Sequence, residues 1–161
     1  MAPNSMLIWK CHKELDSIGN GANLVDTTFI DNAVSAHLCA AEAIRKKPEV
    51  SGRTYFISNN EPVQLWAFVN DILNMAGIDP IQKKISARSA MSVATLTELA
   101  YKFLRLSGEP QVTRFLVHEL ARSHWFDITS AREMLGYEPK ISIEEGFKKM
   151  AGIFSDKTIL R

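Results

Sequence analysis

Residues 31–77 alternate between helical and extended patterns, and this alternation defines the fold class. Apolar residues recur at helical spacing over residues 31–46, and a proline then stops the helix. The apolar run Thr54–Ser58 is typical of a strand buried on both faces of a parallel sheet. A second helix is indicated after Pro62, and Gly77 is the natural residue to follow its end. Helix, buried strand and helix in succession predict an α/β fold.

Composition predicts that helices predominate over strands in this fold. The 161 residues include only 8 glycines and 6 prolines, which leaves room for long regular elements. That length fits one domain, and no repeat or linker divides it, so we expect a single region over residues 1–161. The net charge of +1 gives no strong field for nucleic acid, and we expect no nucleic-acid partner.

Nothing in the sequence indicates a leader, a membrane span or a disulfide framework. The apolar run Met6–Trp9 is too short for a signal peptide, and no stretch approaches the roughly 18 apolar residues of a spanning helix. Cys11 and Cys39 lie far apart, and Cys39 is expected to pack as a small hydrophobic residue. We therefore expect a cytoplasmic protein.

Further elements are predicted on both sides of this core pattern. Leu24–Ile30 is β-branched and aromatic, so it should be extended, whereas residues 1–23 should be irregular around Gly19–Gly21. Extended structure is also expected at Lys84–Ser86. Further helices are predicted at Ala87–Leu106, Thr113–Ser123, Ser130–Leu135 and Ser142–Phe154. Capping residues are predicted at Asp31 or Asn32, at Ser130 with Glu133, at Ser142 with Glu145 and, as a C-terminal glycine, at Gly136.

The helix predicted over residues 87–106 has apolar residues on two faces. Such a helix should touch two apolar surfaces. One is the domain core. The other is either a second part of that core or a ligand, a partner or a membrane surface.

A search for catalytic and metal-binding patterns finds none. Gly19-Asn20-Gly21 lacks the third glycine of a dinucleotide fingerprint, and neither a P-loop nor G-x-S-x-G is present. The four histidines show no metal-ligand pairing. Asp26 and Asp31 would fall on opposite faces of an extended chain, which disfavours a paired acid/base site. Taken alone, the residues indicate an α/β fragment without a catalytic site and without a metal site.

Three segments in order nevertheless resemble one family. They are Asn23–Asn32 with Ala36–Leu38, then Gly52–Pro62, and then Phe126-Asp127, Ala131, Leu135–Tyr137, Pro139 and Glu145-Gly146. In order and spacing they resemble the C-terminal half of extended short-chain dehydrogenases/reductases. The resemblance covers about residues 18–154 and is greatest for the 3β-hydroxysteroid dehydrogenase-like branch. That branch includes sterol 4α-carboxylate 3-dehydrogenases and bacterial 2-alkyl-3-oxoalkanoate reductases, and residues 113–127 look most similar to the bacterial reductases.

The resemblance implies the C-terminal portion of a Rossmann-type fold, with few short strands and an incomplete parallel sheet. In this family a parallel sheet binds NAD or NADP, and the C-terminal part closes over the substrate. Nucleotide-sugar epimerases carry Arg-Asp-Tyr where this chain has Val25-Asp26-Thr27. Because Val25 cannot bind a phosphate as that arginine does, an uncharged, apolar substrate is expected. Val25, Thr27 and Phe29 are the residues expected to line the substrate pocket.

The family's catalytic and cofactor-binding motifs are missing from this sequence. It contains no Gly-x-x-Gly-x-x-Gly, and Tyr55, Tyr101 and Tyr137 are each followed four residues later by a residue other than lysine. The resemblance therefore assigns no catalytic and no cofactor-binding residue here, and we expect the chain alone not to bind NAD or NADP tightly.

Three functions stay open from the sequence. The first is the substrate-side half of an NAD(P)-dependent oxidoreductase that acts on a 3-hydroxy or 3-keto group of an apolar substrate. The second is a stand-alone module that binds a lipid or a protein, and the third is an epimerase or dehydratase fragment. Expected partners are an apolar small molecule and either an N-terminal half or another copy of the chain. Eukaryotic relatives have a membrane-associating apolar segment near residues 87–106, and the charges here imply at most peripheral membrane contact.

Overall fold

The computed structural model describes residues 16–108 and 110–155, and these divide into two compact units. Unit 1 contains residues 16–24 and 64–124, and unit 2 contains residues 25–63 and 125–155. Each unit is therefore built from two separate stretches of chain. Cys11 and the run Met6–Trp9 lie outside the described residues.

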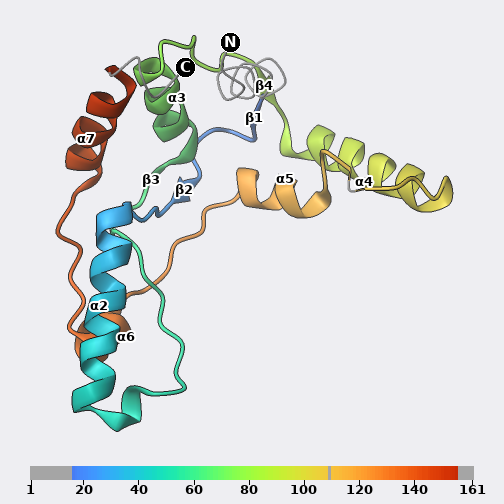
Figure 1. Ribbon diagram of the computed structural model, residues 1–161. Coiled ribbons are helices and arrows are strands. Elements are labelled where there is room, and N and C mark those ends of the chain that lie inside the picture. Colours follow the sequence, from blue (N-terminus) through green and yellow to red (C-terminus); the bar gives the residue numbers. More distant parts are fainter. Residues whose placement is uncertain (1–15, 109, 156–161) are drawn as a thin grey trace. The chain divides into compact units, whose positions relative to one another are not determined.

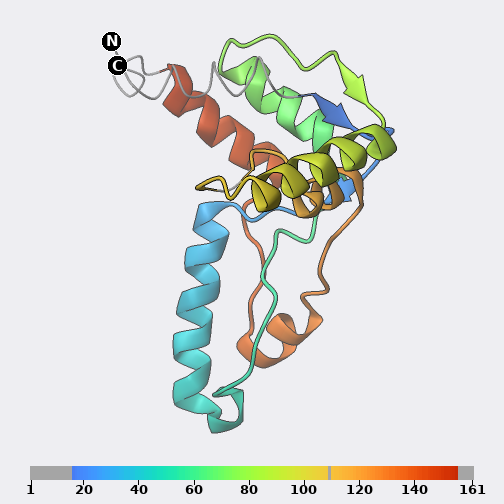
Figure 2. The same ribbon diagram turned by 90° about the vertical axis from the view of Figure 1, so that its right-hand side faces the viewer.

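Unit 1 combines a small parallel sheet with three helices. Strands β1 (Ser17–Ile18) and β4 (Lys84–Ile85) pair in parallel, with Ser17 opposite Lys84. The helices are α3 (Leu65–Met75), α4 (Ala87–Phe103) and α5 (Arg114–Ala121). Helices α4 and α5 pack side by side (Figures 1 and 2). The core of unit 1 is formed by Ile18, Trp66, Ala90, Ala94 and Val117.

Unit 2 is helical. It contains α2 (Ile30–Lys46), the 3-10 helix η1 (Pro48–Val50), α6 (Thr129–Leu135) and α7 (Ile143–Ser155). Helix α2 packs against the short α6 (Figure 1). Its core side carries small residues, which lets α6 and its flanking residues approach closely. The core of unit 2 consists of Ala36, Ala43, Val50, Ile128, Ala131, Leu135 and Tyr137.

A second two-stranded sheet, of β2 (Leu24–Val25) and β3 (Val63–Gln64), lies where the chain passes from one unit to the other. The described chain is thus rich in helix with little sheet, and one strand pair is parallel. This agrees with the predicted helix-rich α/β class.

The strand predicted at Thr54–Ser58 is not formed. No described strand pairs with this segment, although its residues are free of helix. A strand needs a neighbour to accept and donate its ladder hydrogen bonds, and the described residues place none beside it. Two further predictions, of an extended and of an irregular segment, differ from the structure in their bounds. The extended structure at Leu24–Ile30 shortens to β2, and β1 lies within the stretch expected to be irregular.

Two of the four predicted helix caps are formed, and two are not. Ser142 and Glu145 form the predicted reciprocal capping box, and Gly136 ends α6 with a left-handed φ of 71°. The box at Ser130 was wrong, because α6 begins at Thr129, whose amide donates to Asp127 Oδ1 at 2.8 Å. Neither residue predicted to cap α2 does so, because the helix already begins at Ile30.

The long helix α4 ends three residues earlier than predicted and has one apolar face outside the core. Arg105 takes a left-handed φ of 50°, which stops the helix before Leu106. Ala90 and Ala94 are buried in unit 1, whereas Leu96 is 67% exposed and Phe103 79% exposed. Within unit 1, the second apolar face is therefore open. The part of the chain that the structure describes has no helix long and apolar enough to cross a membrane.

Candidate functional site

The three residues predicted to line a substrate pocket lie on one short segment of unit 2, directly before α2. Val25 is buried, with 5% of its surface exposed. Thr27 and Phe29 are half-buried. The segment from Val25 to Phe29 has no helical or strand hydrogen bonding beyond β2, so other groups must hold it in place.

Asn59 holds this segment through its backbone and its side chain. The Asn59 amide donates to the Thr27 carbonyl at 2.8 Å, and the Phe29 amide donates to Asn59 Oδ1 at 3.0 Å. Asn59 Oδ1 also accepts from Asn32 Nδ2 at 2.8 Å. Asn59 thereby fixes the backbone on both sides of Thr28, whose hydroxyl donates to the Ile57 carbonyl.

Asn32, in the first turn of α2, connects the same network to the loop before α7. Its Nδ2 group donates to the Ile141 carbonyl at 2.7 Å as well as to Asn59. Its Oδ1 atom accepts from the Lys140 and Ile141 amides at 2.9 and 3.0 Å. An asparagine amide has two N–H donors and one carbonyl acceptor, and all of them are used here. The side chain is 1% exposed, so water cannot replace these bonds.

Asp26 ties the candidate segment to the turn that follows Thr54–Ser58. Its Oδ2 atom accepts from the Ser58 hydroxyl at 2.6 Å, and its Oδ1 atom accepts from the Glu61 amide. The buried Tyr137 hydroxyl donates to the Ser58 carbonyl at 2.9 Å. Burial, with the nearby Asp26 charge, raises the pKa of Tyr137. A raised pKa and a full hydrogen bond suit a structural tyrosine rather than a proton donor at neutral pH.

Phe29 uses its ring for packing inside unit 2. A Cβ atom added at Gly146 of α7 would lie 2.8 Å from the Phe29 ring, so the glycine lets α7 approach this residue. Lys149 Nζ lies 5.5 Å from the ring centroid and also pairs with Asp31. The assignment of Val25, Thr27 and Phe29 to a substrate pocket stays a prediction.

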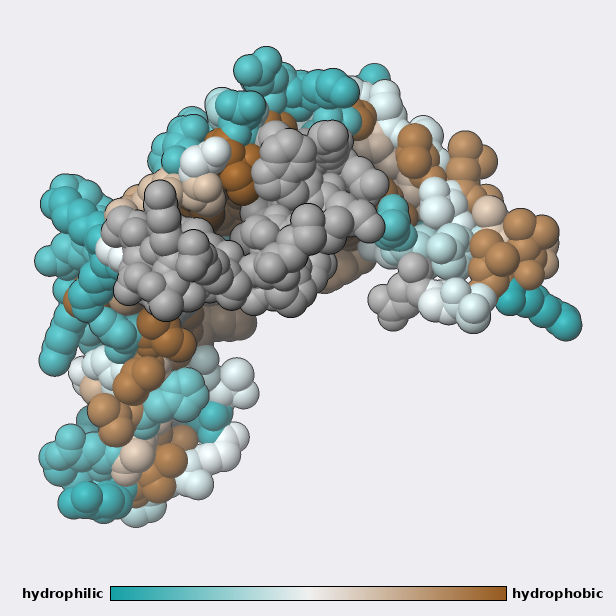
Figure 3. All heavy atoms as spheres, turned by 45° about the horizontal axis from the view of Figure 1, so that its top comes forward, coloured by the Kyte–Doolittle hydropathy of each residue, from teal (hydrophilic) through white to brown (hydrophobic). Residues whose placement is uncertain are grey.

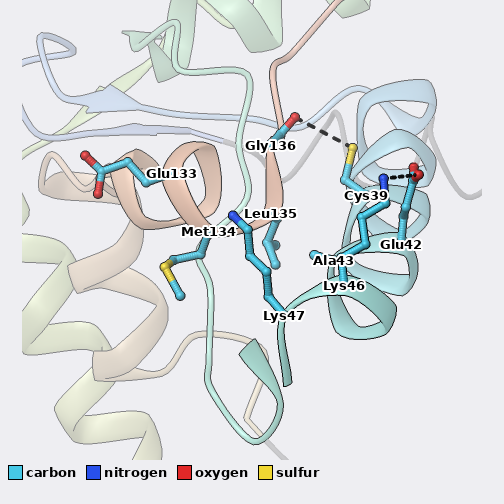
Figure 4. A pocket seen from close by; sticks show the side chains of 9 residues that line it. All are labelled: Cys39, Glu42, Ala43, Lys46, Lys47, Glu133, Met134, Leu135 and Gly136. Carbon is cyan, nitrogen blue, oxygen red and sulfur yellow. Dashed lines mark hydrogen bonds and ion pairs between the residues drawn. The ribbon is translucent and has the colours of Figure 1, made fainter. Parts of the chain in front are cut away.

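Unit 2 has a separate pocket of about 280 Å³ between the C-terminal half of α2 and the end of α6 (Figure 4). Charges of both signs line it, and Lys46 is paired with Glu42 at 2.6 Å. Cys39 faces the Gly136 carbonyl at 3.9 Å and otherwise packs against the core, as a small hydrophobic residue would. None of the residues predicted to bind substrate lines this pocket.

The described turn at Gly19–Gly21 does not have the geometry of a pyrophosphate site. The Gly19–Gly21 turn lies between β1 and β2, and the first helix to follow, α2, begins only at Ile30. A pyrophosphate site needs backbone amides at the start of a helix, directly after a glycine-rich turn. Among the described residues no group of three histidine, cysteine or acidic side chains could hold a metal. The described residues of the candidate site therefore fix the backbone of one segment, Val25–Phe29, through hydrogen bonds.

Asn32 and Asn59 are the important site residues that the sequence analysis missed. Asn32 was expected at most to cap a helix, and Asn59 to bound a strand. One signal was present: Asn32 shares the side of α2 that carries the core residues Ala36 and Ala43. A polar residue among small apolar ones on a buried face requires buried hydrogen-bond partners.

Comparison with solved structures shows which fold the chain has. UDP-glucuronic acid 4-epimerase from Bacillus cereus, solved with NAD, matches with a TM-score of 0.52 and 15% identity over 88% of this chain and 34% of its own. The structure of gox2253 matches with a TM-score of 0.58 and 19% identity, over 99% of this chain and 45% of its own. The described chain therefore has the fold of part of these two structures, which is Rossmann-type.

Comparison with the sequence profiles of protein families shows to which family the chain belongs. The profile of the 3-beta hydroxysteroid dehydrogenase/isomerase family matches residues 3–87, which is more than half of the chain. The chain therefore belongs to the 3-beta hydroxysteroid dehydrogenase/isomerase family, as the ordered motifs predicted.

Curated relatives in this family are much longer than the present chain. The 2-alkyl-3-oxoalkanoate reductase of Stenotrophomonas maltophilia is 42% identical over 83% of this chain and 40% of its own length. The 3beta-hydroxysteroid-dehydrogenase/decarboxylase isoform 1 of Arabidopsis thaliana is 36% identical over 96% of this chain and 37% of its own length. The chain spans about two fifths of the length of these relatives.

Proposed function

We propose that this chain is the substrate-side part of an NAD(P)-dependent oxidoreductase acting on a 3-hydroxy or 3-keto group of an apolar substrate. The observation that carries the proposal is the 42% identity with a 2-alkyl-3-oxoalkanoate reductase over only 40% of that enzyme. A long-chain 2-alkyl-3-oxo acid or a sterol-like alcohol is the substrate class. The proposed activity needs both this chain and a part that binds the dinucleotide.

The motifs that the chain contains and lacks indicate which part of the proposed reaction it supports. It has neither the glycine fingerprint nor the Tyr-x-x-x-Lys pair, so the cofactor and the proton-transfer group must come from elsewhere. The chain contributes the segment Val25–Phe29. Asn59 holds the backbone of this segment by hydrogen bonds, and Asn32 in turn holds the Asn59 side chain. Rigid support of this kind is what a substrate-positioning segment requires.

An apolar substrate is favoured by the residue at position 25. Val25 is buried and uncharged, and the resemblance aligns it with an arginine that binds substrate phosphate in nucleotide-sugar epimerases. A buried valine offers no group to pair with a phosphate, and desolvating one there would be costly. A sugar nucleotide is therefore a poorer fit than a lipid-like substrate.

Unit 2 also has an open surface that suits the dinucleotide-binding part. The outer face of α2 carries exposed apolar side chains, and the extended run Thr54–Ser58 has no strand partner among the described residues. Phe56 is half-exposed even though its ring stacks on Phe126 at 4.3 Å. A parallel sheet that continued from another part would pair this run and cover these side chains. The exposed residues of the α2 outer face are Ile30, Val34, Leu38 and Ile44.

A chimera tests the proposal. The chain replaces the matching region of the Stenotrophomonas maltophilia reductase, and oxidation of NADPH or NADH is followed with a long-chain 2-alkyl-3-oxo acid. We expect reductase activity with this substrate and none with a UDP-sugar. A folded chimera that binds the cofactor and lacks reductase activity would contradict the proposed substrate class.

Two matched variants test the role of the α2 outer face. Leu38 on α2 and Leu96 on α4 are each 67% exposed, so aspartate at either position changes the same kind of surface. Leu38→Asp should lower the activity and the thermal stability of the chimera, because it places a charge in the expected contact. Leu96→Asp should leave both unchanged. Equal effects of the two changes would argue against this docking surface.

A further inference from the structure

The pocket between α2 and α6 in unit 2 has no part in the proposed function, because no residue of the segment Val25–Phe29 lines it. Its walls come from Cys39 and Ala43 on α2 and from Met134 and Leu135 on α6 (Figure 4). These two helices pack against each other within unit 2, so the pocket belongs to one compact unit. Hydrophilic side chains gather at this end of unit 2, which is lowest in Figure 3, and hydrophobic ones lie beside them.

The side of the pocket that lies against the core is apolar. Ala43 and Leu135 are buried core residues, and Cys39 and Met134 pack half-buried against the same core. Cys39 Sγ makes one weak contact, 3.9 Å from the Gly136 carbonyl. A ligand would therefore meet mainly aliphatic carbon and sulfur on this side, which is how small-molecule pockets are commonly lined.

The open side of the pocket carries two lysine ammonium groups. Lys46 pairs with Glu42 at 2.6 Å, so its charge is balanced. The Lys47 ammonium group pairs with no acidic group among the described residues, and it reaches the space between α2 and α6 (Figure 4). Glu133 is the other acid beside the pocket, and its carboxylate points away from that space (Figure 4). The pocket therefore presents one unbalanced positive charge above an apolar surface.

Charge and size together define the class of ligand. A carboxylate pairs with an ammonium group, and aliphatic carbon is stabilised by burial against the apolar side. At about 30 Å³ for each non-hydrogen atom, the volume of about 280 Å³ holds roughly nine such atoms. Hexanoate is of this size, whereas a peptide or a long acyl chain exceeds it. A phosphate ester fits less well, because Lys46 is already paired and a second negative charge would have no partner.

We propose that this pocket binds a small aliphatic monocarboxylate, with its carboxylate against Lys47 and its tail between Cys39, Ala43 and Leu135. The proposal is independent of the proposed function, since it involves neither a cofactor nor the segment Val25–Phe29. The bound ligand touches both α2 and α6, and it therefore stabilises unit 2 in proportion to its occupancy.

Protection of the Cys39 thiol tests this proposal on the whole chain. Cys11→Ser leaves Cys39 as the single thiol of the sequence, and its alkylation by iodoacetamide is followed by mass spectrometry. The probe is sodium hexanoate, and near-saturating hexanoate should slow the alkylation by about tenfold, because the occupied pocket covers the thiol. Sodium chloride at the same ionic strength should give no protection. Hexanol, which has the tail without the charge, should protect at much higher concentrations only.

A matched pair of lysine variants separates the pocket from the rest of the surface. Lys47→Gln should weaken hexanoate binding by about threefold to fivefold, because it removes the ion pair. Lys140→Gln, at an exposed position of unit 2 outside the pocket, should leave binding unchanged.

A pocket-filling variant gives a second measurement that does not depend on the thiol. Hexanoate should raise the melting temperature of the unmodified chain, and Cys39→Met, whose longer side chain occupies the pocket, should abolish that rise. Absence of thiol protection, equal weakening by the two lysine variants, or an undiminished rise in the melting temperature of Cys39→Met would each overturn the proposal.

Discussion

Asn32 makes four hydrogen bonds through a side chain that is almost fully buried, so a small chemical change there should have a large effect. Asn32→Asp keeps the shape but replaces the N–H donors with oxygen, opposite Asn59 Oδ1 and the Ile141 carbonyl. We expect a loss of about 2–4 kcal/mol in unfolding free energy, since buried acceptors lose their donors. Urea unfolding followed by circular dichroism measures this loss.

A control for this change is available on the surface. Asn20 Oδ1 accepts from the Ala22 amide at an exposed turn, and an aspartate there keeps an acceptor. Asn20→Asp should therefore change the unfolding free energy by less than about 0.5 kcal/mol. If Asn32→Asp lowers the unfolding free energy no more than Asn20→Asp does, the buried hydrogen-bond network does not hold the segment Val25–Phe29.

At the scale of elements, the contact between α7 and the candidate segment depends on one glycine. Alanine normally stabilises a helix relative to glycine by up to about 1 kcal/mol. At Gly146 the added Cβ would lie 2.8 Å from the Phe29 ring, whereas at Gly152 it would meet nothing within 4 Å. We expect Gly146→Ala to destabilise by about 1–2 kcal/mol and Gly152→Ala to stabilise. Thermal denaturation compares the two, and stabilisation by both would show that α7 does not pack closely on Phe29.

The contact between α4 and α5 should depend on pH. The Arg114 backbone amide, and then its guanidinium group, lower the pKa of Glu98. The folded protein therefore favours the ionised form. The resulting stabilisation is present above the unfolded-state pKa of about 4.3 and is lost as pH falls through the lower folded-state pKa.

This dependence can be measured with two glutamine variants. Glu98→Gln removes the charge, so the melting temperature of this variant should fall less steeply than that of the unmodified chain below about pH 4.3. Glu49→Gln, at an exposed position in η1, should leave the slope unchanged. Parallel acid profiles for the unmodified chain and Glu98→Gln would contradict the role given to this carboxylate.

Elements that depend on neighbouring residues in the sequence could be predicted. Helix α2 ends at Lys46, two residues before Pro48, and the capping box at Ser142 and Glu145 is formed as its spacing indicates. Both signals act within one turn of helix. The run Thr54–Ser58 was predicted to be a strand buried on both faces, and this was wrong, because Thr54 and Phe56 are exposed and no described strand pairs with the run.

Long-range interactions in the candidate site could not be predicted from the sequence. Asn32 bonds to Ile141, which is 109 residues away in the chain, and Tyr137 bonds to Ser58, which is 79 residues away. No periodicity or capping rule connects such positions. The stripe containing Val34 and Leu38 predicted a helix correctly, yet it faces outward, because α2 packs its small residues against α6.

On the scale of the whole molecule, two units with open apolar faces predict self-association of the isolated chain. Leu38 and Leu96, on different units, are both largely exposed, and exposed faces of this kind bind one another or a partner. Light scattering should give a mass above that of the 18.0 kDa monomer. The aspartate variant at Leu38 should lower that mass. A clean monomer at high concentration would count against this prediction.

The central claim is that this chain supplies the substrate side of an oxidoreductase whose dinucleotide site lies in another part. The most direct test measures binding of NADPH and NADH by fluorescence and thermal shift, first with the chain alone. The same measurement follows after mixing with the region of the Stenotrophomonas maltophilia reductase that this chain does not match. We predict no tight binding by the chain alone, and a stable complex whose melting temperature rises with the cofactor. Tight cofactor binding by the chain alone, or failure of the two parts to associate, would contradict the account.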